Sequence, residues 1–238
     1  MKRKAQVKKR EPGKRGPRSK SARPLDRNSI VSAGLAMTKS LPLRDVSIVR
    51  LSNELVVTPA SIHYYLEGRQ ALTAGIVNRF FQELLAVWPA PRETPKTTLE
   101  TVLRAFYEHY VRYPGIAAFF AAQNRFDLLV QSAHEPGSES LYRFLERYFF
   151  VVESCGFGPK NAAVFAFVLI QFAISAAHAT ASHQLPGEHR EVGAILSGLP
   201  ESEYPAIHRM QRNYLGLTGE AAFETGLQLL LGGMFGEK

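Results

Sequence analysis

Cysteine occurs only once in the 238 residues, at Cys155, so the chain cannot form an internal disulfide. A chain without disulfides suits a reducing compartment, and we therefore expect a cytoplasmic protein. The basic amino terminus is not followed by the apolar run that a signal peptide contains, which argues against secretion.

Signatures of catalysis and of metal binding are also scarce. The seven histidines include no H-x-x-x-H pair, and one cysteine cannot build a thiolate metal site. There is no G-x-S-x-G motif, and Gly156-x-Gly158 lacks the rest of a dinucleotide-binding fingerprint. We therefore expect neither an enzyme nor a bound metal or cofactor.

Alternation at a period of two is missing as well, whereas apolar residues recur at helical spacing through most of the chain. These patterns predict an all-α fold. The predicted helices cover Asp26–Leu41, Ser47–Leu55, Thr58–Leu66, Arg69–Val87, Thr98–Tyr113, Gly115–Gln123, Glu139–Ser154, Asn161–Ser182, Ser202–Asn213 and Gly219–Gly233. Segments 131–139 and 185–200, which contain proline and glycine, are predicted to be loops.

Two short helices with a tight connection are predicted between residues 47 and 66. Ser47 can accept a free backbone N–H of the first helix, and Thr58 can do the same for the second. Pro59 falls at the first position of the second helix, where its missing N–H costs nothing. The outer face of that helix then holds Pro59, Ala60, Ser61, His63 and Tyr64. This arrangement is typical of a helix-turn-helix that reads DNA.

The stretch from Leu25 to Leu72 resembles the amino-terminal DNA-binding domain of the TetR family of bacterial transcriptional regulators. The run Leu66-Glu67-Gly68-Arg69-Gln70-Ala71-Leu72 is similar to the F-x-x-K-x-x-L start of that family's fourth helix. One departure lies in the turn, where Val56 stands in place of the usual glycine, although a β-branched residue disfavours a positive φ.

The resemblance implies a two-domain, all-helical protein of about nine to ten helices in total, preceded by an arm. We expect a disordered basic arm over 1–24, a helix-turn-helix domain over 25–88 that includes the linking fourth helix, and a helical ligand-binding and dimerisation domain over 89–238.

DNA contacts are expected from the two short helices, from the start of the fourth helix and from the arm. Arg69 matches the family's phosphate-contacting lysine and adds a forked donor. Arg50 can touch the DNA backbone or remain solvated, and Tyr65 can pack in the core or reach a phosphate. The predicted DNA-contacting residues are Ser47, Arg50, Thr58, Pro59, Ala60, Ser61, His63, Tyr64, Tyr65, Arg69, Arg15 and Arg18.

The net charge of +8 belongs to residues 1–24, which hold eleven Lys or Arg and one Glu, so the remainder of the chain carries −2. Such a tail can be a solubilising segment or a DNA-binding arm. Lys14-Arg15-Gly16-Pro17-Arg18 resembles the core of an AT-hook, whose arginines enter narrow A·T minor grooves.

The apolar segment Asn161–Ser182 is long enough to cross a membrane. However, Gln171, Ser175, His178 and Ser182 recur at steps of four, three and four residues and make one face polar. Lipid-exposed helices rarely carry such a stripe. We therefore expect a helix that is buried within the protein, and no membrane partner.

Two further stretches resemble the same family. Residues 155–162 are similar to the G-x-x-P-x-x-A entry of its eighth helix, and Phe223–Gly233 to its terminal F-x-x-G-L-x-x-L-L-x-G motif. The resemblance implies a homodimer in which these two helices meet their symmetry mates in a four-helix bundle. The predicted interface residues are Phe167, Ile174, Leu227, Leu230, Leu231 and Met234.

The body of the chain is rich in aromatic residues, which can simply pack in a core. The resemblance implies that some of them line a cavity for a small hydrophobic inducer. The predicted ligand-contacting residues are Phe106, Tyr110, Phe120, Gln123, Phe149, Phe165, Gln171, Ser175 and His178. The tetracycline-binding members of the family have a histidine late in the fourth helix, where this chain has Leu85, which argues against tetracycline–magnesium as the ligand.

The sequence therefore predicts a ligand-responsive regulator, most often a repressor in this family, that binds a palindromic DNA operator as a homodimer and is released by an inducer. Release requires a ligand with different affinities for two conformations. The alternative is an architectural DNA-binding protein in which the basic tail dominates and no inducer acts.

Overall fold

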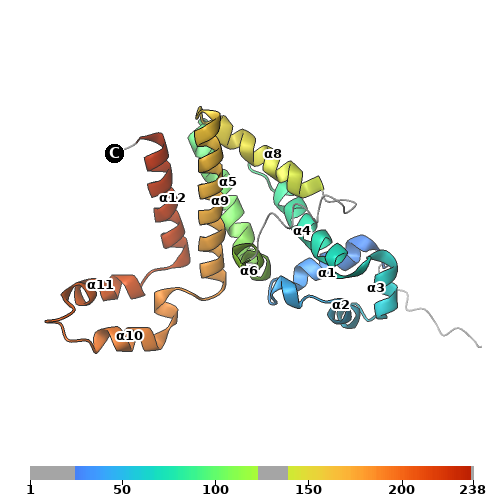
Figure 1. Cartoon of the computed structure of the whole chain (residues 1–238), viewed down its shortest axis with the longest axis horizontal. Coiled ribbons are helices and arrows are strands. Elements are labelled where there is room, and N and C mark those ends of the chain that lie inside the picture. Colours follow the sequence, from blue (N-terminus) through green and yellow to red (C-terminus); the bar gives the residue numbers. More distant parts are fainter. Residues whose placement is uncertain (1–24, 123–138, 237–238) are drawn as a thin grey trace, which may run out of the picture.

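The computed structural model describes residues 25–122 and 139–236, and within these ranges every regular element is helical (Figure 1). In chain order the helices are α1 (Arg27–Met37), η1 (Leu43–Asp45), α2 (Ile48–Glu54), α3 (Pro59–Tyr65), α4 (Gly68–Ala86), α5 (Pro95–Arg112), α6 (Pro114–Ala122), α8 (Glu139–Glu153), α9 (Pro159–Ala181), η2 (Pro186–Glu188), α10 (Arg190–Ser197), α11 (Pro205–Leu215) and α12 (Gly219–Phe235). The predicted all-α class is confirmed.

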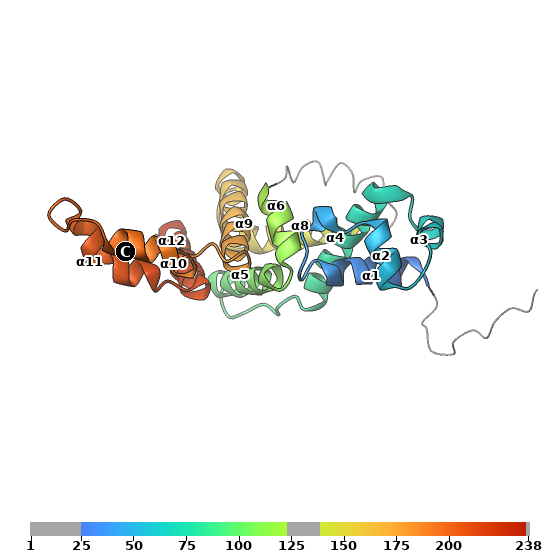
Figure 2. The same cartoon turned by 90° about the horizontal axis from the view of Figure 1, so that it is seen from below.

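Helices α1, α2 and α3 form a small head at one end of the molecule (Figures 1 and 2). Each of them begins at a side-chain cap: Asp26 accepts the N–H of Ser29 at 2.6 Å, and Ser47 and Thr58 cap α2 and α3 in the same way. Ile30, Leu51 and Ile62, one from each helix, are fully buried together. Local capping therefore sets where the helices start, and a small apolar centre holds them against one another.

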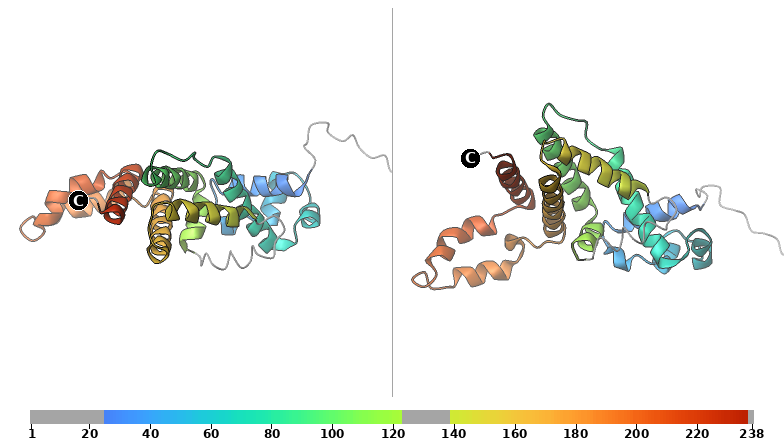
Figure 3. Two further views of the ribbon diagram at one scale, coloured as in Figure 1. Left: turned by 90° about the horizontal axis from the view of Figure 1, so that it is seen from above. Right: turned by 45° about the horizontal axis from the view of Figure 1, so that its top comes forward.

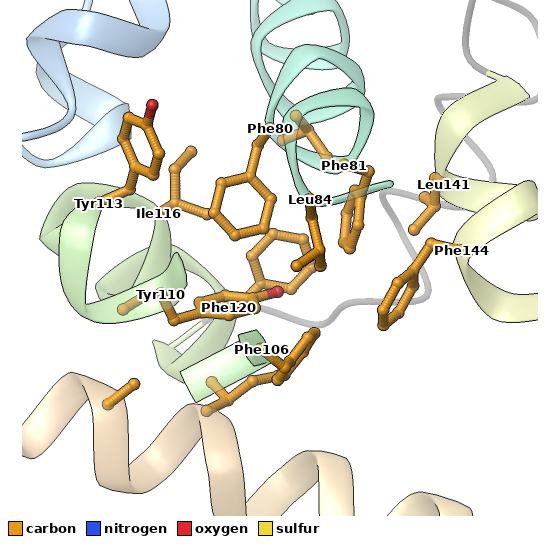
Figure 4. Packing of buried hydrophobic residues seen from close by; sticks show 14 of the residues in the cluster. Phe80, Phe81, Leu84, Phe106, Tyr110, Tyr113, Ile116, Phe120, Leu141 and Phe144 are labelled. Atoms are coloured by element: carbon orange, nitrogen blue, oxygen red, sulfur yellow. The ribbon is translucent and has the colours of Figure 1, made fainter. Parts of the chain in front are cut away.

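Helix α4 connects this head with the body. It packs on α1 and α2 at one end and on α5 and α8 further along. The approach to α1 is close, since a β-carbon at Gly34 would lie 2.7 Å from the side chain of Ile76. Phe80, Phe81 and Leu84 near its other end are buried among the rings of the body (Figure 4). One continuous hydrophobic core therefore runs from the head into the body.

Helix α9 is the central element of the body and packs against α5, α6, α8 and α12. By length and composition alone it could cross a membrane, as the sequence also suggested, and it is the one helix of the described residues that could. Leu169, Ala173 and Ala177 are fully buried against the neighbouring helices, but only 33% of the most apolar stretch is buried. The expectation of a helix buried within the protein was therefore wrong for one face of α9, where Val164, Phe167 and Val168 are exposed. The structure thus gives α9 the role of a packing helix.

Helix α12 returns along α9 and is fastened to α5. Arg104 donates two hydrogen bonds to Glu224, from Nε to Oε1 and from Nη2 to Oε2, each 2.8 Å long. Beside this pair the rings of Tyr107 and Phe223 stack with centroids 3.9 Å apart. Arginine–carboxylate pairs with two parallel bonds fix orientation as well as distance, so α12 is held in one register on the body.

Helices α10 and α11 form an arm that projects from the body at the end opposite the head (Figures 1 and 3). They contact each other and η2, and neither contains a buried residue. The prediction of a loop over 185–200 was wrong here, because α10 occupies half of that segment and η2 a further three residues. Pro186, Gly187, Gly193 and Gly198 gave the sequence a loop-like composition, but only Gly193 lies within α10.

Candidate functional site

Helix α3 presents its outer residues to solvent. Thr58, Pro59, Ala60 and His63 are exposed, and Tyr64 is 83% exposed. Ser61 is half-buried, and its hydroxyl lies 2.9 Å from the Oγ1 of Thr58 within the cap. The side chains that the sequence assigned to a DNA-reading face therefore share one accessible surface at the tip of the head.

Tyr65 occupies an intermediate position. Its ring is half-buried against the core and meets the ring of Tyr64 edge-on, with centroids 5.0 Å apart. This contact restricts the rotation of Tyr64, whose own ring points to solvent. Tyr65 thus supports Tyr64 from the core side.

The connection between α2 and α3 places Val56 in the left-handed region, at a φ of 54°. Its side chain is 90% exposed, so no packing contact explains the conformation. Valine disfavours this region because its branched Cβ approaches the backbone. The turn therefore has the geometry of a glycine turn without the glycine.

Two arginines flank this face. Arg50 is exposed on α2, where the Oγ of Ser47 caps its N–H. Arg69 is exposed at the start of α4 and donates from Nη2 to the carbonyl oxygen of Arg44. That bond holds the guanidinium beside the head. Arg15 and Arg18 lie outside the described residues.

A cavity of about 620 Å³ lies in the body between α4, α5, α6, α8 and α9. Its walls are almost entirely apolar and include rings from each of these helices. Figure 4 shows several of them pointing toward one another, among them Phe81, Tyr110, Phe120 and Phe144. Cavities of this size and character hold small molecules in many proteins.

The rings on one side of the cavity are stacked nearly in parallel. Phe144 lies 5.4 Å from Phe106 at an interplanar angle of 13° and 5.9 Å from Tyr148 at 2°. The Tyr148 hydroxyl donates to the carbonyl oxygen of Ala166 at 2.8 Å, and burial raises the pKa of this tyrosine. Phe144 and the neutral, fixed Tyr148 therefore form a wall of two nearly parallel rings, with Phe106 packed behind it, and this wall suits a flat aromatic molecule.

The cavity and the head are joined by the short helix α6. Phe120 near its carboxyl end lines the cavity, whereas Gly115 at its start donates an N–H to the carbonyl oxygen of Thr38, 2.9 Å away, just after α1. A β-carbon at Gly115 would collide with the carbonyl oxygen of Leu41. The backbone of α6 therefore touches the backbone of the head directly.

Similarity to a known protein family shows which family this chain belongs to. Residues 88–236 match the family described as "Tetracyclin repressor-like, C-terminal domain". The chain belongs to the TetR family of transcriptional regulators. As a TetR-family protein it is a DNA-binding regulator of transcription. No curated protein sequence matches it.

Several solved structures share the fold. Apo ActR from Streptomyces coelicolor is 19% identical and superimposes with a TM-score of 0.69 over 90% of this chain and 98% of ActR. ActR in complex with (S)-DNPA gives 0.71 at 19% identity, over 91% and 100% of the two chains. BioQ from Mycobacterium smegmatis gives 0.57 at 16% identity, over 90% and 99%. At these identities the likeness concerns the fold.

The predicted ligand residues of this TetR-family chain divide in two. Tyr110, Phe120, Phe149 and Gln171 line the cavity. The remaining predicted residues lie elsewhere: Phe106 is buried behind Phe144, Phe165 packs on Phe157, Ser175 is exposed on α9, His178 bonds to Ser182, and Gln123 lies outside the described residues. Leu141, Phe144 and Tyr148 of α8 line the cavity but were not among the predicted residues. Their spacing of three and four residues could have indicated a common face.

The predicted dimerisation residues mostly face inward. Leu227 and Leu231 are fully buried, Ile174 is 2% exposed and lines the cavity, and Leu230 and Met234 are half-buried. Phe167 is 53% exposed and lines the cavity. The apolar stripe of α12 that carries Leu227 and Leu231 packs on α9 of the same chain, so these side chains belong to its own core.

Proposed function

We propose that this chain is a ligand-responsive TetR regulator that binds a palindromic operator as a homodimer in the cytoplasm and is released by a small aromatic inducer. The observation that carries the proposal is α6, which contacts the head through Gly115 and the cavity through Phe120. If a ligand displaces Phe120, α6 can transmit this displacement directly to the helices that hold α3.

Operator recognition is assigned to α3. His63 and Tyr64 point to solvent from a helix that its caps hold at a fixed position, which suits contact with base edges in a major groove. Arg50 and Arg69 flank them and suit phosphate contacts. In a two-fold dimer the two α3 helices would enter successive grooves about 34 Å apart.

A gel-shift series tests this assignment against an architectural role. The full chain and a chain without residues 1–23 are titrated onto DNA selected from a random library, with increasing bulk competitor. We expect both to prefer one palindrome, and the shortened chain to bind more weakly with a flatter salt dependence because fewer counterions are released. Loss of all preference after the deletion would favour the architectural alternative.

The dimer interface is assigned to the face that α9 and α12 expose on this chain. Its apolar members are Val164 and Val168 on α9, at 52% and 40% exposure, and Leu229 on α12 at 72%. Ala222, Thr225 and Gly233 continue the exposed stripe of α12 at steps of three and four residues around Leu229. Small residues on such a stripe allow another helix to approach closely, as a four-helix bundle requires.

The substitution Leu229→Glu tests this interface, with Leu217→Glu as the control on an exposed leucine ahead of α12. Sedimentation equilibrium should give a monomer for Leu229→Glu and an unchanged dimer for Leu217→Glu. A Leu229→Glu protein that remains dimeric would move the interface away from α12.

The inducer is assigned to the cavity of about 620 Å³. ActR has been solved in complex with actinorhodin and with (S)-DNPA, which shows that a TetR protein of similar fold holds small molecules. The rings of Phe144 and Tyr148 favour a planar aromatic molecule here. Release would follow if such a ligand binds more tightly to a conformation in which α4 and α6 have shifted the head.

A further inference from the structure

The cavity has an uneven distribution of charge that bears on which inducer it accepts, and this inference rests on the proposed ligand-binding function. Seven aromatic residues line the cavity, and Glu153 is the only charged side chain among its described lining residues. Gln171 is the only amide among them. A binding site with one carboxylate and no ammonium, guanidinium or imidazole favours positive over negative ligands.

Glu153 lies at the mouth of the cavity. It is the last residue of α8, its side chain is exposed, and Pro159 at the start of α9 lines the cavity at the same end. Phe149, one turn earlier on α8, and Phe167 on α9 also line the cavity, and each is 53% exposed. The entrance is therefore formed by a carboxylate and by aromatic rings whose faces attract cations.

Opposing charges at this end are weaker or do not reach the cavity. The amino terminus of α9 carries about half a positive charge, which is less than the full charge of the carboxylate. Lys160 follows Pro159 in sequence, but its side chain is exposed and is not part of the lining. The hydroxyl of Tyr148 already donates to Ala166 and so does not offer its proton to an anion. Among the residues that the structure describes at this end, the local balance of charge is therefore negative.

We propose that the inducer is a planar aromatic cation whose rings lie between α4, α8 and α9 and whose positive group lies beside Glu153. A carboxylated aromatic molecule of the same shape would place its charge against this carboxylate and bind more weakly. The shape of the cavity admits both molecules, and the charge at its mouth discriminates between them.

Three fluorescent probes with one anthracene body test the proposal: 9-(aminomethyl)anthracene, 9-anthracenemethanol and anthracene-9-carboxylate. They differ mainly in charge, which is positive, zero and negative at neutral pH. Each is titrated into the full chain without DNA, because aromatic cations also bind DNA. We expect the ammonium probe to bind most tightly and the carboxylate probe most weakly.

Three variants locate the effect. Glu153→Gln should weaken binding of the ammonium probe about fivefold, a modest factor because the site is open to solvent, and leave the alcohol unchanged. Glu146→Gln removes an exposed carboxylate two turns earlier on α8, outside the lining, and should change neither. Ala163→Trp places an indole at an exposed lining position and should reduce binding of all three probes.

The outcomes separate this inference from the proposed function. Equal affinities, a reversed order, or an ammonium affinity unchanged by Glu153→Gln would overturn the preference for cations while leaving a ligand cavity in place. If no probe binds, or if Ala163→Trp affects none of them, both the cation preference and the cavity as an inducer site are overturned.

Discussion

The outer face of α3 and the cavity of the body are built in opposite ways. The face consists of side chains that project from a seven-residue helix, and its position is set by the hydroxyl of Thr58 and the ring of Pro59. The cavity is a space left between five helices, and its walls come from residues as far apart as Phe81 and Ile174. In the proposed function, recognition of DNA would thus depend on local geometry, whereas recognition of a ligand would depend on tertiary packing.

The two regions meet at the amino end of α6, and a change at this junction should have the largest effect. Gly115→Ala would drive a β-carbon into the carbonyl oxygen of Leu41, so we expect a loss of about 3 kcal/mol of stability. Denaturant unfolding measures it. Gly158→Ala is the control, because nothing lies within 4 Å of its added carbon.

The same variant should separate the functions that we propose for the two regions. If the chain still folds, we expect Gly115→Ala to bind the uncharged probe 9-anthracenemethanol while releasing operator DNA poorly in its presence. Normal release would show that the signal does not pass through this contact.

Truncation of the recognition face should affect one region alone. We expect Tyr64→Ala to weaken operator binding roughly tenfold, since the ring is 83% exposed and its loss removes a DNA contact without opening the core. Probe binding in the cavity should not change. Tyr214→Ala on α11, where the ring is 49% exposed, serves as the control and should leave operator affinity unchanged. Fluorescence anisotropy with labelled operator measures the affinity of both variants. If Tyr64→Ala and Tyr214→Ala lost the same affinity, Tyr64 would not belong to the DNA interface.

The turn before α3 allows a sharper test of how far local geometry governs the head. Val56→Gly should raise stability by about 1 kcal/mol, because glycine adopts the observed positive φ without steric cost. Val49→Gly, at an exposed position within α2, should instead lower it by about 1 kcal/mol. Destabilisation by both substitutions would indicate that the strain at Val56 is negligible. Thermal unfolding of the two variants provides the comparison.

The smallest effect is expected from pH, and it concerns the body. Burial lowers the pKa of His109, whose Nε2 donates to the carbonyl oxygen of Phe80 at 3.0 Å. The unfolded chain therefore binds a proton at His109 more readily than the folded chain does. The contribution of His109 to the free energy of unfolding is fully present above about pH 6.5 and is lost as the pH falls below this value. His109→Gln should flatten this part of the stability profile. Hydrogen bonds from Ser29 and Arg104 lower the pKa values of Asp26 and Glu224, respectively. These two carboxylates therefore affect the pH dependence of stability only at more acidic pH.

The sequence predicted the elements whose position depends on nearby residues. Ser47 and Thr58 cap the helices that they were expected to cap, and Pro59 takes the first position of α3. Tyr65 shows the limit of such reasoning, because its position in the sequence allowed it either to pack in the core or to reach a phosphate. Only the tertiary packing shows that its ring is half-buried against the core.

The orientation of α12 was beyond the reach of the sequence for a physical reason. Leucines occupy several of its faces, so periodicity alone does not say whether Leu227 or Leu229 meets the body. The structure buries Leu227 against α9 and leaves Leu229 at 72% exposure. The cavity poses the same difficulty, because Phe106 and Phe144 are both aromatic and buried, and only the packing shows which of them faces the open space.

The contact between Gly115 and the head also limits how this protein can relay a signal. Helix α6 has nine residues and is roughly 13 Å long, too short to bend appreciably. In the proposed function, a ligand that displaced Phe120 would therefore move Thr38 by a rigid displacement of α6 of similar size. Such a short relay would need no long chain of cooperating side chains, and the proposed sensitivity to an inducer would depend on how the ligand fits against the ring of Phe120.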